Sequence, residues 1–551
     1  MKKFFIGFIF ILLIFAAGGF YFLNSRGSSE TSTKYKEFSF IYEDKDIDKK
    51  DFAKIDGQYY LSLDFIKEYI DDTISYDESE KAVIFVNTKG TKRIVLGANE
   101  AFLNDQRVGL RSAVIEKDGK VLIPSEIFIY DYPVSLRYIE DKKVLVMDRK
   151  DIEYAVGIPT GDGLNMREED SIKSPIVSIL KRDNKVYVYG EKGDFYKVRE
   201  IDGYSGYIKK SLLDVEFPKN KFKLEIGIDN GEAVKPLNLT WDYTYGPQSQ
   251  ESIDAITSIK GLNVICPTWF SVANSNLDII DRGNQEYVNK YKALGIEVWA
   301  YLDNSFNADL THEVLSKSSS RYILATKTLR LAKRYGLSGV NVDFENTKIE
   351  DRENITQFVR ELSGMFHSEG LKVSVDVTPQ ISSDVTKEPY NRKELARFCD
   401  YVILMAYDQH WASSKKAGSV AEYKWVEGNL NVLFRQIPQE KLVLGVPLYS
   451  RLWSENDSNV KSSSLSMNQV KNIIESKGSS ISWDDVSKQD YTEYSENDKL
   501  YKIWIEDAKS IEWKTSLINK YNLAGIASWR KGFETSDIWD TIDSVLSNIK
   551  Y

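Results

Sequence analysis

The chain has 551 residues, of which 42% are hydrophobic and 28% are charged, and its formal net charge at pH 7 is −9. This length exceeds what one ordinary core organises, so two to four domains are expected. The composition excludes a disordered or fibrous protein, and the negative charge argues against a nucleic-acid partner.

The amino terminus carries a long apolar segment. Lys2 and Lys3 precede an uncharged run from Phe4 to Leu23. Such a run can span a bilayer as a helix, and its positive flank favours an inside amino terminus. We therefore expect residues 1–26 to form a single-pass anchor in the cell membrane, which makes the membrane a partner and places the rest of the chain on its outer side. The alternative is a cleaved signal peptide and a secreted protein. The polar residues 27–36 are expected to be a linker.

An internal repeat follows in residues 37–150. The pattern at 56–63 recurs at 118–125, and each unit predicts a strand, a short helix and a β-hairpin. The segment resembles the copper amine oxidase N-terminal-like stalk domain, although it holds no recognisable copper ligands, so we interpret it as an α+β spacer. Residues 153–216 form short predicted strands with glycine-containing turns, and they resemble a bacterial SH3-like domain, a small all-β barrel.

Strands alternate with amphipathic helical segments in residues 222–551. Eight apolar strand candidates occur: Leu237–Thr244, Leu262–Ser271, Ile296–Leu302, Gly339–Glu345, Leu371–Thr378, Tyr401–Tyr407, Leu442–Leu448 and Gly525–Trp529. Eight such units predict an α/β fold, a (β/α)8 TIM barrel. Residues 454–505 lie between the seventh and eighth strands and predict an inserted α+β subdomain.

The fourth predicted strand carries the chemistry. Side chains alternate along a strand, so Asn341, Asp343 and Glu345 share one face of it. Buried polar groups cost free energy unless they are paired or used, and barrel enzymes keep their reacting groups at the carboxyl ends of strands. Two neighbouring carboxyls with little water raise each other's pKa, as a general acid requires.

Several segments resemble glycoside hydrolase family 18. The family signature Asp-Gly-x-Asp-x-Asp-x-Glu aligns with residues 338–345, where Ser338 and Asn341 replace two of the acidic residues. The variant with asparagine is similar to the spore-wall, peptidoglycan N-acetylglucosaminidase-like branch of the family. Further resemblances lie on the sixth, seventh and eighth predicted strands, at residues 404–408, 444–449 and 525–534.

The resemblance implies a retaining, substrate-assisted hydrolysis of β-glycosidic bonds beside N-acetylglucosamine. Glu345 would be the catalytic acid, Asp343 would stabilise the oxazolinium intermediate, and Tyr407 would hold the acetamido oxygen. The residues implied to bind substrate are Asn341, Asp408 and Trp529. Asn341 is expected to orient Asp343 through a hydrogen bond.

The sequence leaves the substrate open. Peptidoglycan and chitin both carry the required acetamido group, and the wall-associated modules favour peptidoglycan, including spore cortex. Alternatives are a chitinase or chitooligosaccharide hydrolase, and a non-catalytic protein that binds or tethers the wall. We predict no cofactor and no metal, because the histidines His312, His367 and His410 lack ligand spacing, and no disulfide from Cys266 and Cys399.

Overall fold

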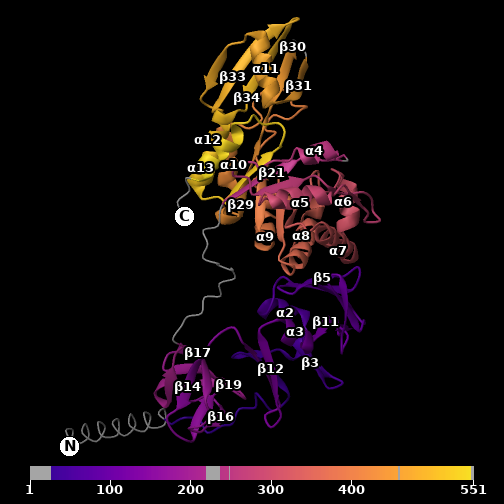
Figure 1. Ribbon diagram of the computed structural model, residues 1–551. Coiled ribbons are helices and arrows are strands. Elements are labelled where there is room, and N and C mark those ends of the chain that lie inside the picture. Colours follow the sequence, from indigo (N-terminus) through magenta and orange to yellow (C-terminus); the bar gives the residue numbers. More distant parts are fainter. Residues whose placement is uncertain (1–25, 219–235, 247, 457–458, 548–551) are drawn as a thin grey trace, which may run out of the picture. The chain divides into compact units, whose positions relative to one another are not determined.

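The computed structural model describes residues 26–218, 236–246, 248–456 and 459–547 (Figure 1). The chain divides into two compact units. The first comprises Met1–Thr73, Leu96–Asn99 and Leu110–Asp229, and the second comprises Ile74–Val95, Glu100–Gly109 and Asn230–Tyr551. The second unit therefore contains both the predicted barrel and part of the predicted stalk.

The predicted membrane anchor requires a correction. Its apolar run falls within residues 1–25, which lie outside the described residues. Among the residues that the structure does describe, no helix combines the length and the apolar character needed to cross a bilayer. This finding stands against the predicted single-pass anchor and the membrane location, and neither is carried further.

Two four-stranded sheets in the first unit reflect the sequence repeat. One has the order β12 (Val134–Ile139), β13 (Val144–Arg149), β1 (Ser39–Tyr42), β2 (Lys45–Ile47), and the other β10 (Ile115–Lys117), β11 (Lys120–Pro124), β4 (Gln58–Ser62), β3 (Phe52–Ile55). Helix α2 (Leu63–Tyr69) follows β4, and α3 (Ser125–Asp131) follows β11. The Ser62 hydroxyl caps α2 by accepting a hydrogen bond from the Phe65 N–H. The two repeats pair with each other through β4 and β11.

The first unit also contains the SH3-like module, a seven-stranded sheet. Its strand order is β16 (Ile176–Leu180), β15 (Leu164–Arg167), β19 (Ser205–Lys209), β18 (Phe195–Glu200), β17 (Val186–Lys192), β14 (Ala155–Pro159), β20 (Leu213–Glu216). Its core is built from Met166, Leu180, Val186, Val198, Ile208 and Leu213. Part of the predicted linker lies along this module, since the backbone N–H groups of Ser28 and Ser32 donate to the carbonyls of Ile172 and Ile176.

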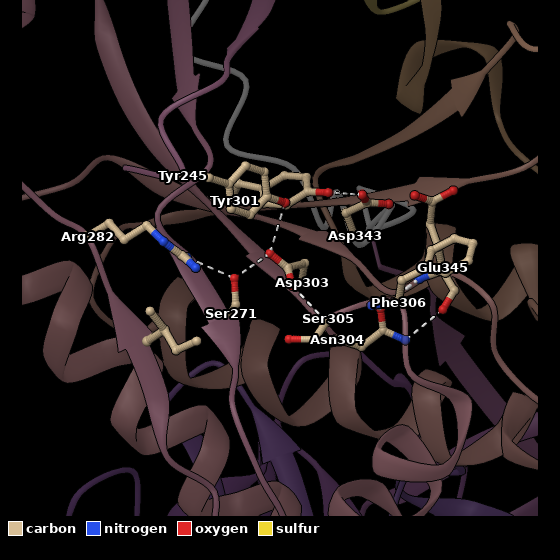
Figure 2. A pocket seen from close by; sticks show the side chains of 11 residues that line it. Tyr245, Ser271, Arg282, Tyr301, Asp303, Asn304, Ser305, Phe306, Asp343 and Glu345 are labelled. Carbon is tan, nitrogen blue, oxygen red and sulfur yellow. Dashed lines mark hydrogen bonds between the residues drawn. The ribbon is translucent and has the colours of Figure 1, made fainter. Parts of the chain in front are cut away.

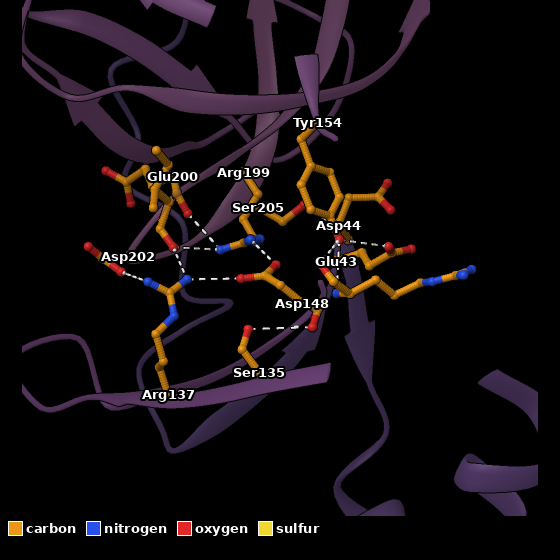
Figure 3. Close-up of polar contacts among 12 residues, drawn as sticks. Glu43, Asp44, Ser135, Arg137, Asp148, Tyr154, Arg199, Glu200, Asp202 and Ser205 are labelled. Carbon is orange, nitrogen blue, oxygen red and sulfur yellow. Dashed lines mark hydrogen bonds and ion pairs between the residues drawn. The ribbon is translucent and has the colours of Figure 1, made fainter. Parts of the chain in front are cut away.

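A buried carboxylate joins the repeat to the SH3-like module (Figure 3). Asp148, at the end of β13, pairs with Arg137 at 2.9 Å and also with Arg199, which is fully buried on β18. Arg199 further donates to the carbonyls of Glu200 and Ile201. Removing one partner of a buried ion pair is strongly destabilising, because the other charge stays buried without a partner. This contact therefore stabilises the interface between the repeat and the SH3-like module.

The second unit contains the predicted barrel. Its eight parallel strands are β21 (Leu237–Asp242), β22 (Val264–Pro267), β25 (Glu297–Asp303), β26 (Gly339–Asp343), β27 (Lys372–Val377), β28 (Tyr401–Met405), β29 (Leu442–Pro447) and β35 (Gly525–Trp529). The pairing of β22 with both β21 and β25 closes the barrel. The predicted fold class is confirmed, because each of these strands lies within or overlaps a segment that the sequence indicates.

Helices surround the barrel and an insertion extends from it. The surrounding helices include α5 (Gln285–Ala293), α6 (Ala308–Leu315), α7 (Ser318–Tyr335), α8 (Arg352–His367), α9 (Arg392–Phe398), α10 (Tyr423–Leu433), α12 (Ala508–Tyr521) and α13 (Ile538–Leu546) (Figure 1). The α+β insertion consists of β30 (Tyr449–Asn456), β31 (Asn459–Ser466), α11 (Met467–Lys477), β32 (Ile481–Asp484), β33 (Gln489–Glu496) and β34 (Lys499–Ile505).

A sheet from the stalk repeat packs on the outside of the barrel. It has the order β5 (Ser75–Asp77), β6 (Ala82–Asn87), β7 (Gly90–Val95), β8 (Glu100–Leu103), β9 (Gln106–Gly109). The Thr91 hydroxyl donates to the Glu361 carbonyl on α8 at 2.6 Å. Gly364 of α8 lies so close to β6 that a Cβ there would stand 2.6 Å from a Val86 methyl. The sheet is therefore integral to the barrel's unit.

Acidic side chains of this sheet cap α7. Glu80 accepts hydrogen bonds from the Ser318 hydroxyl and the Ser319 N–H, both at 2.7 Å, and Asp77 accepts from the Ser318 N–H at 2.7 Å. Glu80 also pairs with Arg93 at 2.9 Å. Negative charge at a helix N-terminus complements the exposed N–H groups there.

We expect Glu80→Ala to lower the free energy of unfolding of the second unit by about 1–3 kcal/mol, because Arg93 and the first turn of α7 both lose a partner. Urea denaturation followed by tryptophan fluorescence measures this directly, since every tryptophan of the chain lies after residue 240. The control is Glu369→Gln, which breaks an exposed pair with Lys333 and should cost less than about 1 kcal/mol. Equal losses in the two variants would contradict the capping role.

Candidate active site

A pocket opens beside the carboxyl end of β26 (Figure 2). Asp343 is the last residue of this strand and Glu345 follows two positions later. The pocket has a volume of about 320 Å³. Its lining residues are Tyr245, Ser271, Ile280, Arg282, Tyr301, Asp303, Asn304, Ser305, Phe306, Asp343 and Glu345. The two acidic residues singled out by the sequence thus line one cavity.

Asp343 is a buried carboxyl with one oxygen engaged. The Tyr301 hydroxyl donates to its Oδ2, while its Oδ1 is buried and has no hydrogen-bond partner among the described residues. Burial, and then the charges of Glu345 and Asp376, raise the pKa of Asp343 well above its usual value. An unsatisfied buried carboxylate oxygen is costly, and such groups commonly mark a functional role.

The backbone of Glu345 is fixed by Asn304. The Asn304 Oδ1 accepts from the Glu345 N–H at 3.1 Å, and its Nδ2 donates to the Glu345 carbonyl at 2.6 Å. The same Nδ2 donates to the Thr311 hydroxyl at 2.8 Å. Burial, followed by the charges of Asp408 and Asp303, raises the pKa of the Glu345 carboxyl. A raised pKa suits a group that must deliver a proton.

Asn341 has a different role from the one expected. It is fully buried, and its Oδ1 accepts from the Trp241 indole N–H at 2.9 Å. Its Nδ2 donates to Asp376 at 2.8 Å and to the Ser374 hydroxyl at 3.0 Å. In the described part of the chain, no hydrogen bond joins Asn341 to Asp343. The expected hydrogen bond to Asp343 is therefore not present there, and the expected contact of Asn341 with substrate stays a prediction.

Tyr407 lies beyond the carboxyl end of β28 and is half-buried. Burial, and then the charges of Asp376, Asp343 and Glu345, raise its pKa well above the usual value. The hydroxyl therefore keeps its proton and can act as a hydrogen-bond donor. Tyr407 therefore interacts electrostatically with Asp376, Asp343 and Glu345.

The remaining two predicted residues also lie at strand ends. Asp408 adopts a left-handed backbone with φ of 57° and accepts hydrogen bonds from the Tyr449 hydroxyl at 2.6 Å and Arg451 at 2.8 Å. Trp529 ends β35, and its ring lies 5.9 Å from that of Trp241. Neither is among the residues that line the pocket of Figure 2, although the charge of Asp408 contributes to the raised pKa of Glu345.

Residues of β25 complete the site, and the sequence analysis missed them. Tyr301 and Asp303 alternate along this strand and stand opposite Asn341 and Asp343 in the parallel register. Asp303 accepts from the Ser271 hydroxyl at 2.7 Å and the Tyr245 hydroxyl at 3.3 Å. The signal was present, because Tyr301 and Asp303 follow the same two-residue period that identified Asp343 and Glu345.

One cluster in the described ranges has the groups to hold a metal. His312, Glu350 and Asp351 bring ligand atoms within 4.8 Å of one another. The His312 Nδ1 lies 2.8 Å from an Asp351 oxygen that also accepts from Asn354, so a hydrogen-bond network accounts for the arrangement. We assign no metal to it.

Comparison with known proteins identifies the barrel. A model of glycosyl hydrolases family 18 matches residues 273–533. The barrel belongs to glycoside hydrolase family 18. Models of the bacterial SH3 domain and the copper amine oxidase N-terminal domain match residues 162–214 and 42–146. The resemblances drawn from the sequence are thus confirmed, and the chain is a glycoside hydrolase.

Relatives of the family 18 barrel include bacterial glycosylases. The uncharacterized glycosylase YvbX of Bacillus subtilis (strain 168) is 26% identical over 327 residues, which cover 57% of this chain and 92% of that protein. The cortical fragment-lytic enzyme of the same organism is 26% identical over 254 residues, which cover 45% of this chain and 59% of that enzyme. This chain therefore spans little more than half the length of the second relative.

Solved structures share the fold of the family 18 barrel. The C-terminal domain of a putative chitinase from Desulfitobacterium hafniense DCB-2 is 21% identical with a TM-score of 0.51, and the match covers 57% of this chain and 99% of that one. The spore cortex-lytic enzyme SleL of Bacillus megaterium QM B1551 is 19% identical with a TM-score of 0.51, covering 57% and 75%. At these identities the likeness shows the fold alone.

The charge of Asp303, after burial and the charge of Asp408, should influence the basic limb of the pH–activity profile. It raises the pKa of Glu345, and an acid catalyst loses activity as the pH rises through its pKa. Asp303→Asn should therefore move the basic limb of kcat/KM to lower pH. Asp281→Asn, an exposed change near the same pocket, is the control and should leave the limb in place. A limb that stays fixed in Asp303→Asn, or moves to higher pH, would contradict this electrostatic account.

Proposed function

We propose that the barrel hydrolyses the β-glycosidic bond beside N-acetylglucosamine in peptidoglycan, with retention of configuration and with the substrate's own acetamido group as nucleophile. The observation that carries the proposal is the buried Asp343 Oδ1, which lacks a partner and lines the same pocket as Glu345. A carboxylate oxygen in that setting is suited to accept the acetamido N–H.

Glu345 would act as the general acid. Its raised pKa keeps a proton available, and the Asn304 bonds fix the backbone from which its side chain projects. The proton would pass to the glycosidic oxygen as the bond to the anomeric carbon breaks. Positioning of this kind supports catalysis because small displacements of a reacting group are costly.

Asp343 and Tyr407 would act on the acetamido group. Asp343 would accept its N–H and stabilise the positive oxazolinium, while the Tyr301 hydroxyl holds the other carboxyl oxygen in place. The Tyr407 hydroxyl, which keeps its proton, would donate to the acetamido oxygen and direct it toward the anomeric carbon. No protein nucleophile is needed, and water then opens the oxazolinium.

Asp408 and Trp529 would contact the sugar outside the pocket of Figure 2. Asp408 keeps acceptor capacity beyond its bonds to Tyr449 and Arg451. Trp529 would present an apolar face to the sugar ring. Asn341 would contribute indirectly, by fixing Asp376 and Trp241 beneath the site.

A module that accompanies the barrel in this chain, and one of the chain's relatives, favour peptidoglycan over chitin as the substrate. One relative is named a cortical fragment-lytic enzyme, and the chain carries a bacterial SH3 domain, which the sequence resemblance links to wall-associated enzymes. Chitin carries the same acetamido group, so a chitinase activity is the second outcome that the experiments below distinguish. A purely wall-binding protein would not need the retained pair Asp343 and Glu345.

Two substitutions test the mechanism. Asp343→Asn keeps the side-chain shape but removes the charge that stabilises the oxazolinium, and it should lower kcat by about 10²–10³-fold. Glu345→Gln removes the proton donor and should lose more on substrates with poor leaving groups than on activated aryl glycosides. Kinetics on defined muropeptide and chitin oligomers measure both effects.

A stable thiazoline mimic of the oxazolinium gives an independent readout. It should bind the wild type tightly and Asp343→Ala weakly, because the mimic and the charge are complementary. The exposed control Asp281→Asn should bind it as the wild type does. Equal affinity of the wild type and Asp343→Ala would sink the substrate-assisted mechanism, and absence of cleavage of every glycan would favour the binding-protein alternative.

A further inference from the structure

Arg282 is a cation that lines the same pocket as Asp343 and Glu345. Its Nη1 donates to the Ser271 hydroxyl at 3.0 Å and to the Trp269 carbonyl at 3.3 Å, and its guanidinium lies 5.0 Å from the centre of the Tyr245 ring. Across the described ranges, no carboxylate lies within ion-pair distance of it. Arginine elsewhere in this unit is commonly paired, as Arg93 is with Glu80 and Arg451 is with Asp408.

The surroundings hold this guanidinium in place. Ser271 is buried, and its hydroxyl donates to Asp303, so the serine bridges the arginine and the carboxyl without an ion pair. The opposite edge of the guanidinium, with Nη2 and Nε, has no hydrogen bond within the described residues. Arginine binds carboxylates through two parallel N–H donors of a guanidinium whose position is fixed, and the Nη2 and Nε edge of Arg282 offers such donors.

The pocket separates this cation from the catalytic acid. Figure 2 shows Arg282 and Glu345 at opposite ends of it, with Asp303 between them. The volume of about 320 Å³ lies within the range of small-ligand sites. Ile280 and the Tyr245 ring add apolar surface beside the guanidinium. A group that combines a carboxylate with a small apolar part would satisfy this end of the pocket.

We propose that Arg282 binds the free lactyl carboxylate of an N-acetylmuramic acid next to the N-acetylglucosamine at the catalytic carboxyls. In peptidoglycan the two sugars alternate, and the muramic acid carries a 3-O-lactyl group whose carboxyl is free only where no stem peptide is attached to it. Chitin has no such group. The inference rests on the proposed function and deepens it, because it makes Arg282 the residue that distinguishes peptidoglycan strands without stem peptides from chitin.

The test compares three soluble tetrasaccharides. The first alternates N-acetylglucosamine and N-acetylmuramic acid with free lactyl carboxylates, the second is the same molecule with those carboxylates converted to methylamides, and the third is chitotetraose. The wild type should cleave the free acid with a kcat/KM about 10- to 100-fold above that of the methylamide, as expected for a charge-assisted hydrogen bond. Arg282→Gln should abolish this preference, so that the free acid and the methylamide are cleaved with similar kcat/KM.

Two control variants, and the substrate preference of the wild type, show whether the effect belongs to the Arg282 guanidinium. Arg334→Gln removes an exposed arginine outside the pocket that pairs with Asp281, and it should retain the preference. Arg282→Lys keeps the charge without the fork and should retain part of it. If the wild type cleaves the acid and the methylamide equally, or if Arg282→Gln lowers cleavage of all three alike, the inference is overturned while the proposed hydrolysis stands. If the wild type cleaves chitotetraose alone, the peptidoglycan assignment and the inference both fail, and cleavage of none of them overturns the proposed function itself.

Discussion

Carboxyl groups crowded into the barrel's carboxyl end, with little water to solvate them, are the constraint on which the site depends. Burial and neighbouring negative charges raise the pKa of Asp343, Asp376 and Glu345 together. Each additional charge in this space is expensive, so the cluster retains protons that isolated carboxyls would lose. Tyr301 and Asn341 relieve part of that cost by donating hydrogen bonds to Asp343 and Asp376. In the proposed mechanism, the same crowding that destabilises the folded barrel would supply the acid for catalysis.

Stabilising contacts lie at a distance from that cluster. The sheet β5–β9 caps α7 and covers α8 on the outside of the barrel. Lys514 and Glu506 form a fully buried pair between α12 and the end of the insertion. These contacts stabilise the outer helices and the insertion. The residues at the carboxyl ends of the barrel strands therefore contribute less to stability and can be chemically reactive groups. A stalk repeat thereby contributes to the barrel's unit as well as to the first unit.

Much of this architecture could be predicted because the relevant patterns are local. Apolar runs of strand length identified the eight barrel strands, and the two-residue period of β26 identified the face with Asp343 and Glu345. The same period on β25 contained Tyr301 and Asp303, but a tyrosine and one aspartate without a known motif gave no reason to select them.

Other features depend on packing between distant segments, which a pattern along one strand does not contain. The hydrogen-bond partners of Asn341 come from β21 and β27, so its engagement with Trp241 and Asp376 became visible only in the closed barrel. The repeat predicted strands in residues 74–109 but not the helices that they cover. Arg282 lies outside every recognised motif, and its significance comes from the pocket it lines and from the absence of an ion pair to it among the described residues.

The central claim is that the substrate's acetamido group, held by Asp343, attacks the anomeric carbon. The most direct measurement is the anomeric configuration of the newly formed reducing end, followed by proton NMR in the first minutes of cleavage of a defined N-acetylglucosamine-containing oligomer. The account predicts that the β-anomer appears first and then mutarotates, because two displacements at the same carbon retain configuration. Initial formation of the α-anomer would show direct attack by water and would contradict the account.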